Sequence, residues 1–151
     1  MSSGFVLFRL GERTFATPLD AVREIVRLSG LQTLPGMTPP LAGVIELRGL
    51  PLPVVDVRES GDDDRGDVLV VDAGDESVGV AVDAVSAVLH PDELPAADAS
   101  TSTSLPAYVV GVRHRAGAPV LLVDLNLLLD VTAAGWTEQL KTATVAVPSQ
   151  T

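Results

Sequence analysis

The chain repeats one pattern of glycine, aspartate and apolar residues. Six residues recur 63 positions later: Gly11, Phe15, Asp20, Ala21, Val22 and Ile25 match Gly74, Val78, Asp83, Ala84, Val85 and Val88. A second set recurs 68 positions later: Gly43, Pro51, Val55 and Asp56 match Gly111, Pro119, Val123 and Asp124. Self-similarity at a fixed offset indicates one supersecondary unit built more than once. We therefore predict two similar small barrels, with these aspartates in equivalent positions and the seam between the barrels as the first place for a binding surface.

Short apolar segments between turn residues predict β-strands. Residues 5–10 and 13–17 flank Gly11-Glu12 and predict a hairpin, and residues 43–47 and 52–57 predict a second one. Similar segments return at 68–71, 78–82, 85–89, 108–112 and 119–123. Valine dominates these segments, and β-branched residues favour the pleated surface of a sheet. The predicted fold class is therefore all-β.

Helical signals are few and lie mainly near the C-terminus. Residues 19–21 predict a single helical turn, and residues 124–129 predict a short helix with Asp124 as its N-cap. We expect one domain over residues 1–145, with the first barrel mainly in 5–60 and the second mainly in 67–125. A C-terminal helical segment is expected over 124–143, including a helix at 136–143. Residues 144–151 are expected to be a disordered tail.

Composition excludes several classes of function. Twenty acidic residues against ten basic residues give a net charge of −10, which repels nucleic-acid backbones and anionic membranes. Aromatic residues make up 3% of the chain, too few for the stacking surfaces of single-strand-binding barrels. No apolar run approaches the roughly 20 residues of a membrane helix. We expect a cytoplasmic protein with no nucleic-acid partner and no membrane insertion.

No catalytic, cofactor or metal site is expected from the residue types. The chain has no cysteine, and its two histidines, His90 and His114, are far apart and have no obvious catalytic companions. Aspartates follow several apolar runs, at Asp56, Asp72, Asp83 and Asp124. Because most of them recur with the repeat, a turn or cap role needed once per barrel explains them more simply than acid–base chemistry. An acidic barrel enzyme using paired aspartates stays as an alternative.

One segment resembles a known family. Residues 43–58 read Gly-Val-Ile-Glu-Leu-Arg-Gly-Leu-Pro-Leu-Pro-Val-Val-Asp-Val-Arg. This resembles the signature of CheW-type chemotaxis coupling proteins, in which Gly-Val-x-Asn-Leu-Arg-Gly runs into x-x-Pro-Val-Val-Asp-Leu. Residues 5–11 and 78–89 are also similar to strands of that family, so the resemblance covers about residues 4–130. Glu46 departs from the pattern, because it stands where the family has asparagine.

The resemblance implies two SH3-like five-stranded barrels with a hydrophobic groove between them, and no enzymatic activity. It implies a scaffold that couples methyl-accepting chemoreceptors to the regulatory domain of the histidine kinase CheA. Such a scaffold is cytoplasmic and joins receptor arrays at the inner face of the membrane through its partners. An adaptor of another chemosensory pathway, such as one controlling pili, is a further alternative.

The resemblance also implies that the groove between the barrels binds receptor helices through a set of six residues. The matching positions are Val22, Glu24, Gly43, Arg48, Gly49 and Val85. Glu24 and Arg48 have opposite charges on segments expected to be neighbours, so we predict that they form an ion pair that leaves guanidinium donors free. For Val22 and Val85, a core role is an equally good interpretation.

Overall fold

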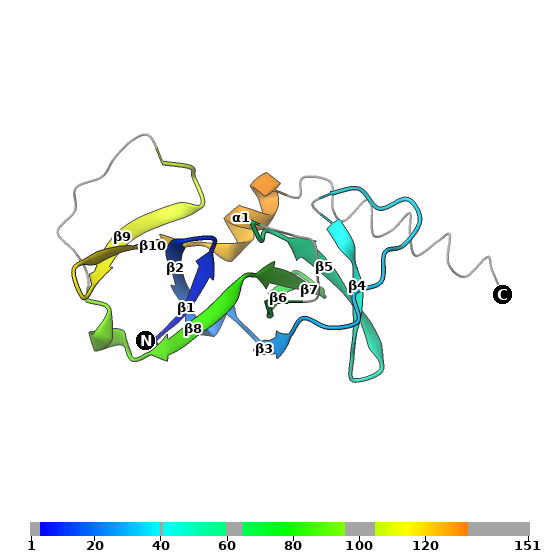
Figure 1. Cartoon of the computed structure of the whole chain (residues 1–151), viewed down its shortest axis with the longest axis horizontal. Helices are drawn as coiled ribbons and strands as arrows, with labels where there is room; N and C mark the ends of the chain where they lie inside the picture. The colour runs from blue at the N-terminus through cyan, green and yellow to red at the C-terminus, as the bar shows by residue number, and fades with distance from the viewer. Residues whose placement is uncertain (1–3, 40, 60–64, 96–104, 133–151) are drawn as a thin grey trace.

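The computed structural model describes residues 4–39, 41–59, 65–95 and 105–132, whose strands form two five-stranded sheets (Figure 1). The strands of the first repeat are β1 (Phe5–Leu10), β2 (Arg13–Pro18), β3 (Glu24–Arg27), β4 (Leu41–Leu47) and β5 (Leu50–Asp56). Those of the second repeat are β6 (Asp67–Ala73), β7 (Glu76–Val82), β8 (Ala84–Leu89), β9 (Val109–Arg115) and β10 (Ala118–Val123). Two 3₁₀ turns, η1 (Leu19–Ala21) and η2 (Pro91–Glu93), and one helix, α1 (Leu125–Thr132), complete the described chain.

The two sheets are equivalent by duplication. Barrel A is the sheet of order β8-β1-β2-β10-β9, and barrel B is the sheet of order β3-β6-β7-β5-β4. The counterparts in the two repeats are β1 and β6, β2 and β7, β3 and β8, β4 and β9, and β5 and β10. When each strand of barrel A is replaced by its counterpart, the result is the strand order of barrel B. Even the parallel pairs correspond, since Ala16 lies opposite Leu122 in barrel A and Val54 lies opposite Gly79 in barrel B. The predicted all-β architecture of two similar barrels is confirmed.

The strands are nevertheless shared between the repeats, so the predicted division into residues 5–60 and 67–125 is wrong. Each repeat gives its first two strands to one barrel and its last three to the other. After Pro18 the chain turns through η1, and β3 then pairs with β6 instead of returning to β1. The second crossover is the single residue Asp83, which is too short for a hairpin, so β8 continues from barrel B to pair with β1.

The paired aspartates lie at equivalent points, as predicted. Asp20 and Asp83 lie in the two crossovers between the barrels. Asp56 and Asp124 lie at the ends of β5 and β10, and each accepts a hydrogen bond from the backbone N–H two residues later, over 3.0 Å and 2.9 Å respectively. Such an Asx turn is the local role expected of a repeated aspartate.

Three hydrophobic cores hold the molecule together. Barrel A encloses a core that includes Phe5, Leu7 and Leu94, and barrel B encloses one that includes Leu28, Ile45 and Leu52. The largest core lies between the barrels, where Phe8 and Phe15 stack at 5.7 Å and meet the valines of β6 and β7. The faces of the central strands therefore alternate between a barrel core and the shared core.

Helix α1 closes the shared core. Leu125, Leu128 and Leu129 are buried against it, while Asp124 Oδ1 accepts the N–H groups of Asn126 (2.9 Å) and Leu127 (3.1 Å). The predicted N-cap is thus confirmed. The helix predicted at 136–143 and the tail predicted at 144–151 lie outside the described residues. Within the described part of the chain, no helix has the length and apolar character needed to cross a bilayer.

Candidate functional site

The CheW-like signature lies on the β4–β5 hairpin. Leu47 and Leu50 form its last pair, and Arg48 and Gly49 form the turn with φ angles of 51° and 80°. Positive φ at both central residues is the property of a type I′ hairpin turn. The equivalent turn of barrel A has Ala116 and Gly117 with φ angles of 53° and 79°. The backbone shape is therefore common to both repeats, and the guanidinium is what the first repeat adds.

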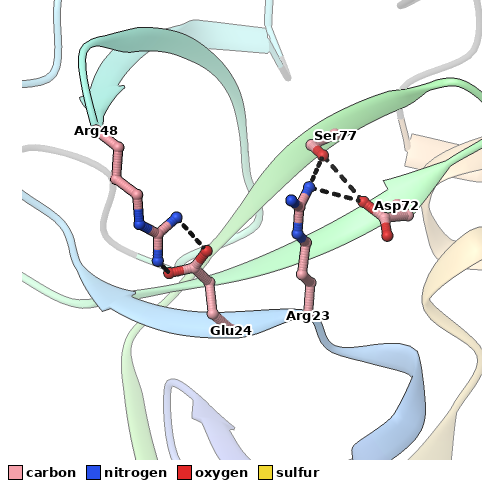
Figure 2. A network of polar contacts seen from close by, with 5 residues as sticks. All are labelled: Arg23, Glu24, Arg48, Asp72 and Ser77. Atoms are coloured by element: carbon pink, nitrogen blue, oxygen red, sulfur yellow. Dashed lines mark hydrogen bonds and ion pairs between the residues drawn. The ribbon is translucent and has the colours of Figure 1, made fainter.

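Arg48 forms a bidentate ion pair with Glu24, as predicted (Figure 2). Its Nη1 donates to Glu24 Oε2 over 2.7 Å, and its Nη2 donates to Oε1 over 2.5 Å. Glu24 begins β3, and the Arg48 turn ends β4, so the pair joins the two edge strands of barrel B. The Arg48 side chain is 68% exposed and that of Glu24 is 21% exposed. The outer face of the guanidinium is thus open to solvent.

The pairing fixes the charge state of both groups. Hydrogen bonds from Arg48 hold the pKa of Glu24 below its ordinary value, although partial desolvation opposes the shift. The charges of Arg48 and Arg23 lower it further. Conversely, the hydrogen bonds and charge of Glu24 raise the pKa of Arg48. Both groups are therefore ionised at neutral pH, and the site presents a charged, oriented fork of N–H donors.

A second polar cluster lies beside this pair (Figure 2). Arg23 Nη1 lies 3.4 Å from Asp72 Oδ1 and donates to Ser77 Oγ over 3.0 Å. Ser77 Oγ in turn donates to Asp72 over 2.9 Å. The cluster ties the start of β3 to β6 and β7, and so helps to place Glu24. Sequence reasoning missed it because Arg23 is 49 residues from Asp72 and 54 residues from Ser77 in the chain.

A groove of about 620 Å³ runs along the hairpin. It is lined by Ser29, Gly30, Gln32, Val44, Ile45, Glu46, Arg48, Gly49, Leu50 and Pro51. Leu50, which directly follows the turn, is 69% exposed. The hairpin tip therefore offers a large apolar side chain and a guanidinium within three residues of each other. Arginine is enriched at protein–protein interfaces relative to the rest of a protein surface, so this tip is a candidate protein-binding surface.

The other candidate residues have structural surroundings. Gly43 has a φ of 151°, and a Cβ there would overlap the carbonyl oxygen of Gln32. This close approach lets Gln32 and Val44 exchange two backbone hydrogen bonds of 2.8 Å. Val22 and Val85 are equivalent by duplication and both pack, half-buried, against the shared core. The structure thus gathers Glu24, Gly43, Arg48 and Gly49 around one hairpin, and places the two valines elsewhere.

The seam between the barrels is a packed core with a pocket of about 370 Å³. Its lining residues are Phe8, Leu10, Phe15, Asp56, Val57, Arg58, Tyr108, Val123 and Leu128. Arg58, whose side chain is 1% exposed, donates to both carboxylate oxygens of Asp56 over 2.9 Å and to the Arg65 carbonyl over 2.7 Å. None of the six candidate residues lines this pocket. Sequence reasoning missed this ion pair. The position of Arg58, two residues after Asp56, was the sequence feature that could have indicated it.

The aspartates considered for catalysis are engaged in the structure. Asp56 holds Arg58, Asp72 belongs to the surface cluster, Asp83 accepts backbone N–H groups, and Asp124 caps α1. Neither the hairpin groove nor the seam pocket is lined by two carboxylates. Over the described residues, no three His, Asp or Glu side chains converge to hold a metal ion. These arrangements fit turns and ion pairs better than acid–base catalysis.

Comparison with known proteins agrees with this architecture. A model of the CheW-like domain matches residues 4–133. A chemotaxis protein CheW from Rhizobium meliloti (strain 1021) is 30% identical over 130 residues, which is 80% of this chain and 83% of the relative. A chemotaxis protein CheW from Klebsiella aerogenes is 27% identical over 133 residues, covering 83% of this chain and 80% of the relative. The crystal structure of the scaffolding protein TtCheW from Thermoanaerobacter tengcongensis has the same fold, with a TM-score of 0.66, 22% identity, and coverage of 83% of this chain and 86% of that one. The chain therefore belongs to the CheW-like domain family.

Proposed function

We propose that this protein is a chemotaxis coupling scaffold that holds the histidine kinase CheA against the cytoplasmic tip of methyl-accepting chemoreceptors. The match to the CheW-like domain over residues 4–133 and the named chemotaxis relatives support this role. The role places the protein in the cytoplasm, at receptor arrays on the inner face of the membrane. It requires binding surfaces for two different proteins and no catalytic residues.

The Arg48 hairpin is the observation that carries the receptor half of the proposal. Glu24 holds the guanidinium in one orientation, so little side-chain entropy remains to be lost when a partner binds. The donors that Glu24 does not use face solvent beside the exposed Leu50. A receptor helix with an acidic residue next to an apolar stripe matches this surface, because the carboxylate meets Arg48 while the stripe covers Leu50.

The two barrels differ in charge at equivalent places, which supports two distinct partners. Exposed Arg9 and Arg13 of barrel A correspond, 63 residues later, to exposed Asp72 and Glu76 of barrel B. Exposed His114 corresponds in the same way to Glu46, 68 residues earlier. Since complementary charge decides which protein surfaces meet, one fold can present two ends of different specificity.

Substitution of Arg48 tests the assignment of the receptor site. Arg48→Ala gives the first hairpin the Ala-Gly turn that the second hairpin already has, so the fold is expected to persist. We expect receptor binding to weaken by about 1 to 3 kcal/mol, the range for losing a charge-assisted hydrogen bond, while kinase binding stays nearly unchanged. Calorimetric titration of the variant with a receptor cytoplasmic fragment and with the kinase regulatory domain measures both values.

Glu24→Ala and the double variant distinguish direct contact of Arg48 with the receptor from a purely structural role of Arg48 in holding Glu24. If Arg48 only braces Glu24, both single variants lower the melting temperature alike and weaken both partners together, with non-additive effects in the double variant. If Arg48 contacts the receptor, its loss affects that partner alone. Unchanged binding of both partners to Arg48→Ala would rule out the hairpin as the receptor site.

A further inference from the structure

The two barrels are joined at two crossovers that are equivalent by duplication but differ in how they are held. The first crossover runs from β2 to β3 and contains Asp20. The second is Asp83 alone, between Val82 at the end of β7 and Ala84 at the start of β8. A one-residue connection between two strands that pair in different barrels is a natural place for the angle between the barrels to be set.

The Asp83 carboxylate binds backbone groups of both barrels. Its Oδ2 accepts the N–H of Gly11 over 2.7 Å and the N–H of Glu59 over 3.3 Å. Gly11 lies in the β1–β2 turn of barrel A, and Glu59 follows β5 of barrel B. The backbone N–H of Asp83 also donates to the Arg9 carbonyl over 3.1 Å. One oxygen atom thus ties a turn of one barrel to a loop of the other.

The two tied segments are in close contact. A Cβ at Gly11 would overlap the carboxylate of Glu59, and the φ of 63° at Gly11 itself favours glycine. The residues next to the two donors, Leu10 and Arg58, both line the seam pocket. A change in the distance between Gly11 and Glu59 would therefore change the pocket directly.

The equivalent residue in the first crossover makes no such connection. Asp20 is exposed, and its carboxylate accepts no hydrogen bond from the described residues. We propose that Asp83 is a positioning residue that fixes the angle between the barrels, and hence the shape of the seam, through its bonds to Gly11 and Glu59. The backbone of the β2–β3 crossover is bonded to both barrels, through Leu19 to Gly4 and through Arg23 to Val70, but among the described residues its aspartate makes no tie like that of Asp83. Asp20 is therefore a matched control.

Amide hydrogen exchange on the full chain tests the bonds themselves. In Asp83→Ala, the amides of Gly11 and Glu59 should exchange about ten-fold faster or more, the change expected on losing a charge-assisted hydrogen bond. The amides of Leu69 and Leu122, in the central strands of the two barrels, should keep their protection. In Asp20→Ala all four should exchange as in the unmodified protein. Equal acceleration of all amides in Asp83→Ala would show general destabilisation and overturn the proposal.

A distance measurement tests the consequence for the barrels. The chain has no cysteine, so spin labels can be placed only at introduced ones, in the variant pair Asp75→Cys on barrel B and His114→Cys on barrel A. We expect one narrow distance distribution, broadened or shifted by Asp83→Ala and unchanged by Asp20→Ala. Should Asp83→Ala fail to fold, Asp83→Asn, which keeps one acceptor oxygen without the charge, should give an intermediate broadening. Identical distributions in the unmodified, Asp83 and Asp20 proteins would contradict the proposal.

Discussion

At the scale of single residues, the duplication allows each residue of one repeat to be compared with the residue at the equivalent position of the other. Arg48 and Ala116 occupy turns of the same backbone shape, so the consequence of the arginine can be separated from that of the turn. Its pairing with Glu24 followed from the sequence, because the opposite charges were expected on neighbouring strands. The Arg23–Asp72–Ser77 cluster did not follow, because nothing local marks a contact across about 50 residues.

Gly43 and Gly111 are equivalent glycines with different surroundings. Gly43→Ala should lower the free energy of unfolding by about 1 to 3 kcal/mol, because the new methyl group would force the Gln32 backbone away and break its two bonds to Val44. At Gly111 a Cβ would meet only the Leu122 side chain, at 3.6 Å. Gly111→Ala should therefore be neutral, or stabilising by up to about 1 kcal/mol. Urea unfolding of the two variants measures the difference, and equal losses would contradict the assigned role of Gly43.

The Glu24–Arg48 pair predicts a pH dependence of known sign. Because the pKa of Glu24 is lowered in the folded protein, its contribution to stability is complete above the ordinary glutamate pKa of about 4.3. It is lost as the pH falls through the lowered value. Glu24→Gln should therefore melt below the unmodified protein at pH 7, and the two melting temperatures should converge in acid. Glu46→Gln, at an exposed position on the same hairpin, serves as the control. A Glu24→Gln deficit that stays constant down to pH 3 would be inconsistent with this pairing.

At the scale of elements, hairpins were predictable and crossovers were not. The pairs β1–β2 and β4–β5 join strands through short turns, so glycine and alternating apolar residues indicate them locally. Pro18 ends β2 in either topology, and no residue nearby specifies whether β3 returns to β1 or crosses to β6. That choice depends on burying the valines of β6 and β7 against Phe8 and Phe15, which is a long-range effect.

The cap of α1 gives a prediction at this scale. Asp124→Ala should cost about 0.5 to 2 kcal/mol, because two N–H groups in the first turn of the helix lose their acceptor. Asp124→Ser should recover most of the loss. In the same helix, exposed Asp130 lies near the C-terminus, where a negative charge is unfavourable, so Asp130→Ala should be neutral or slightly stabilising. Thermal unfolding compares the three, and an Asp124→Ala variant as stable as Asp130→Ala would show that the cap is not needed.

At the scale of the whole molecule, strand exchange makes the two barrels one folding unit. Neither repeat contains a complete barrel, and the shared core draws on strands of both. The two barrels therefore hold their outer surfaces in one spatial relation, which is what a scaffold between two proteins requires. The duplication itself was visible in the sequence, whereas the exchange was not, because similarity between repeats does not say which copies pair.

The central claim is that this chain bridges a kinase and a receptor, and co-sedimentation of three components tests it most directly. The CheA regulatory domain and a receptor cytoplasmic fragment from the same cell are centrifuged together, with and without this protein. We expect the kinase domain to sediment with the receptor only when the protein is present, and much less with Arg48→Ala. If the protein binds neither component, or if the kinase sediments with the receptor equally well without it, the proposed coupling role is wrong.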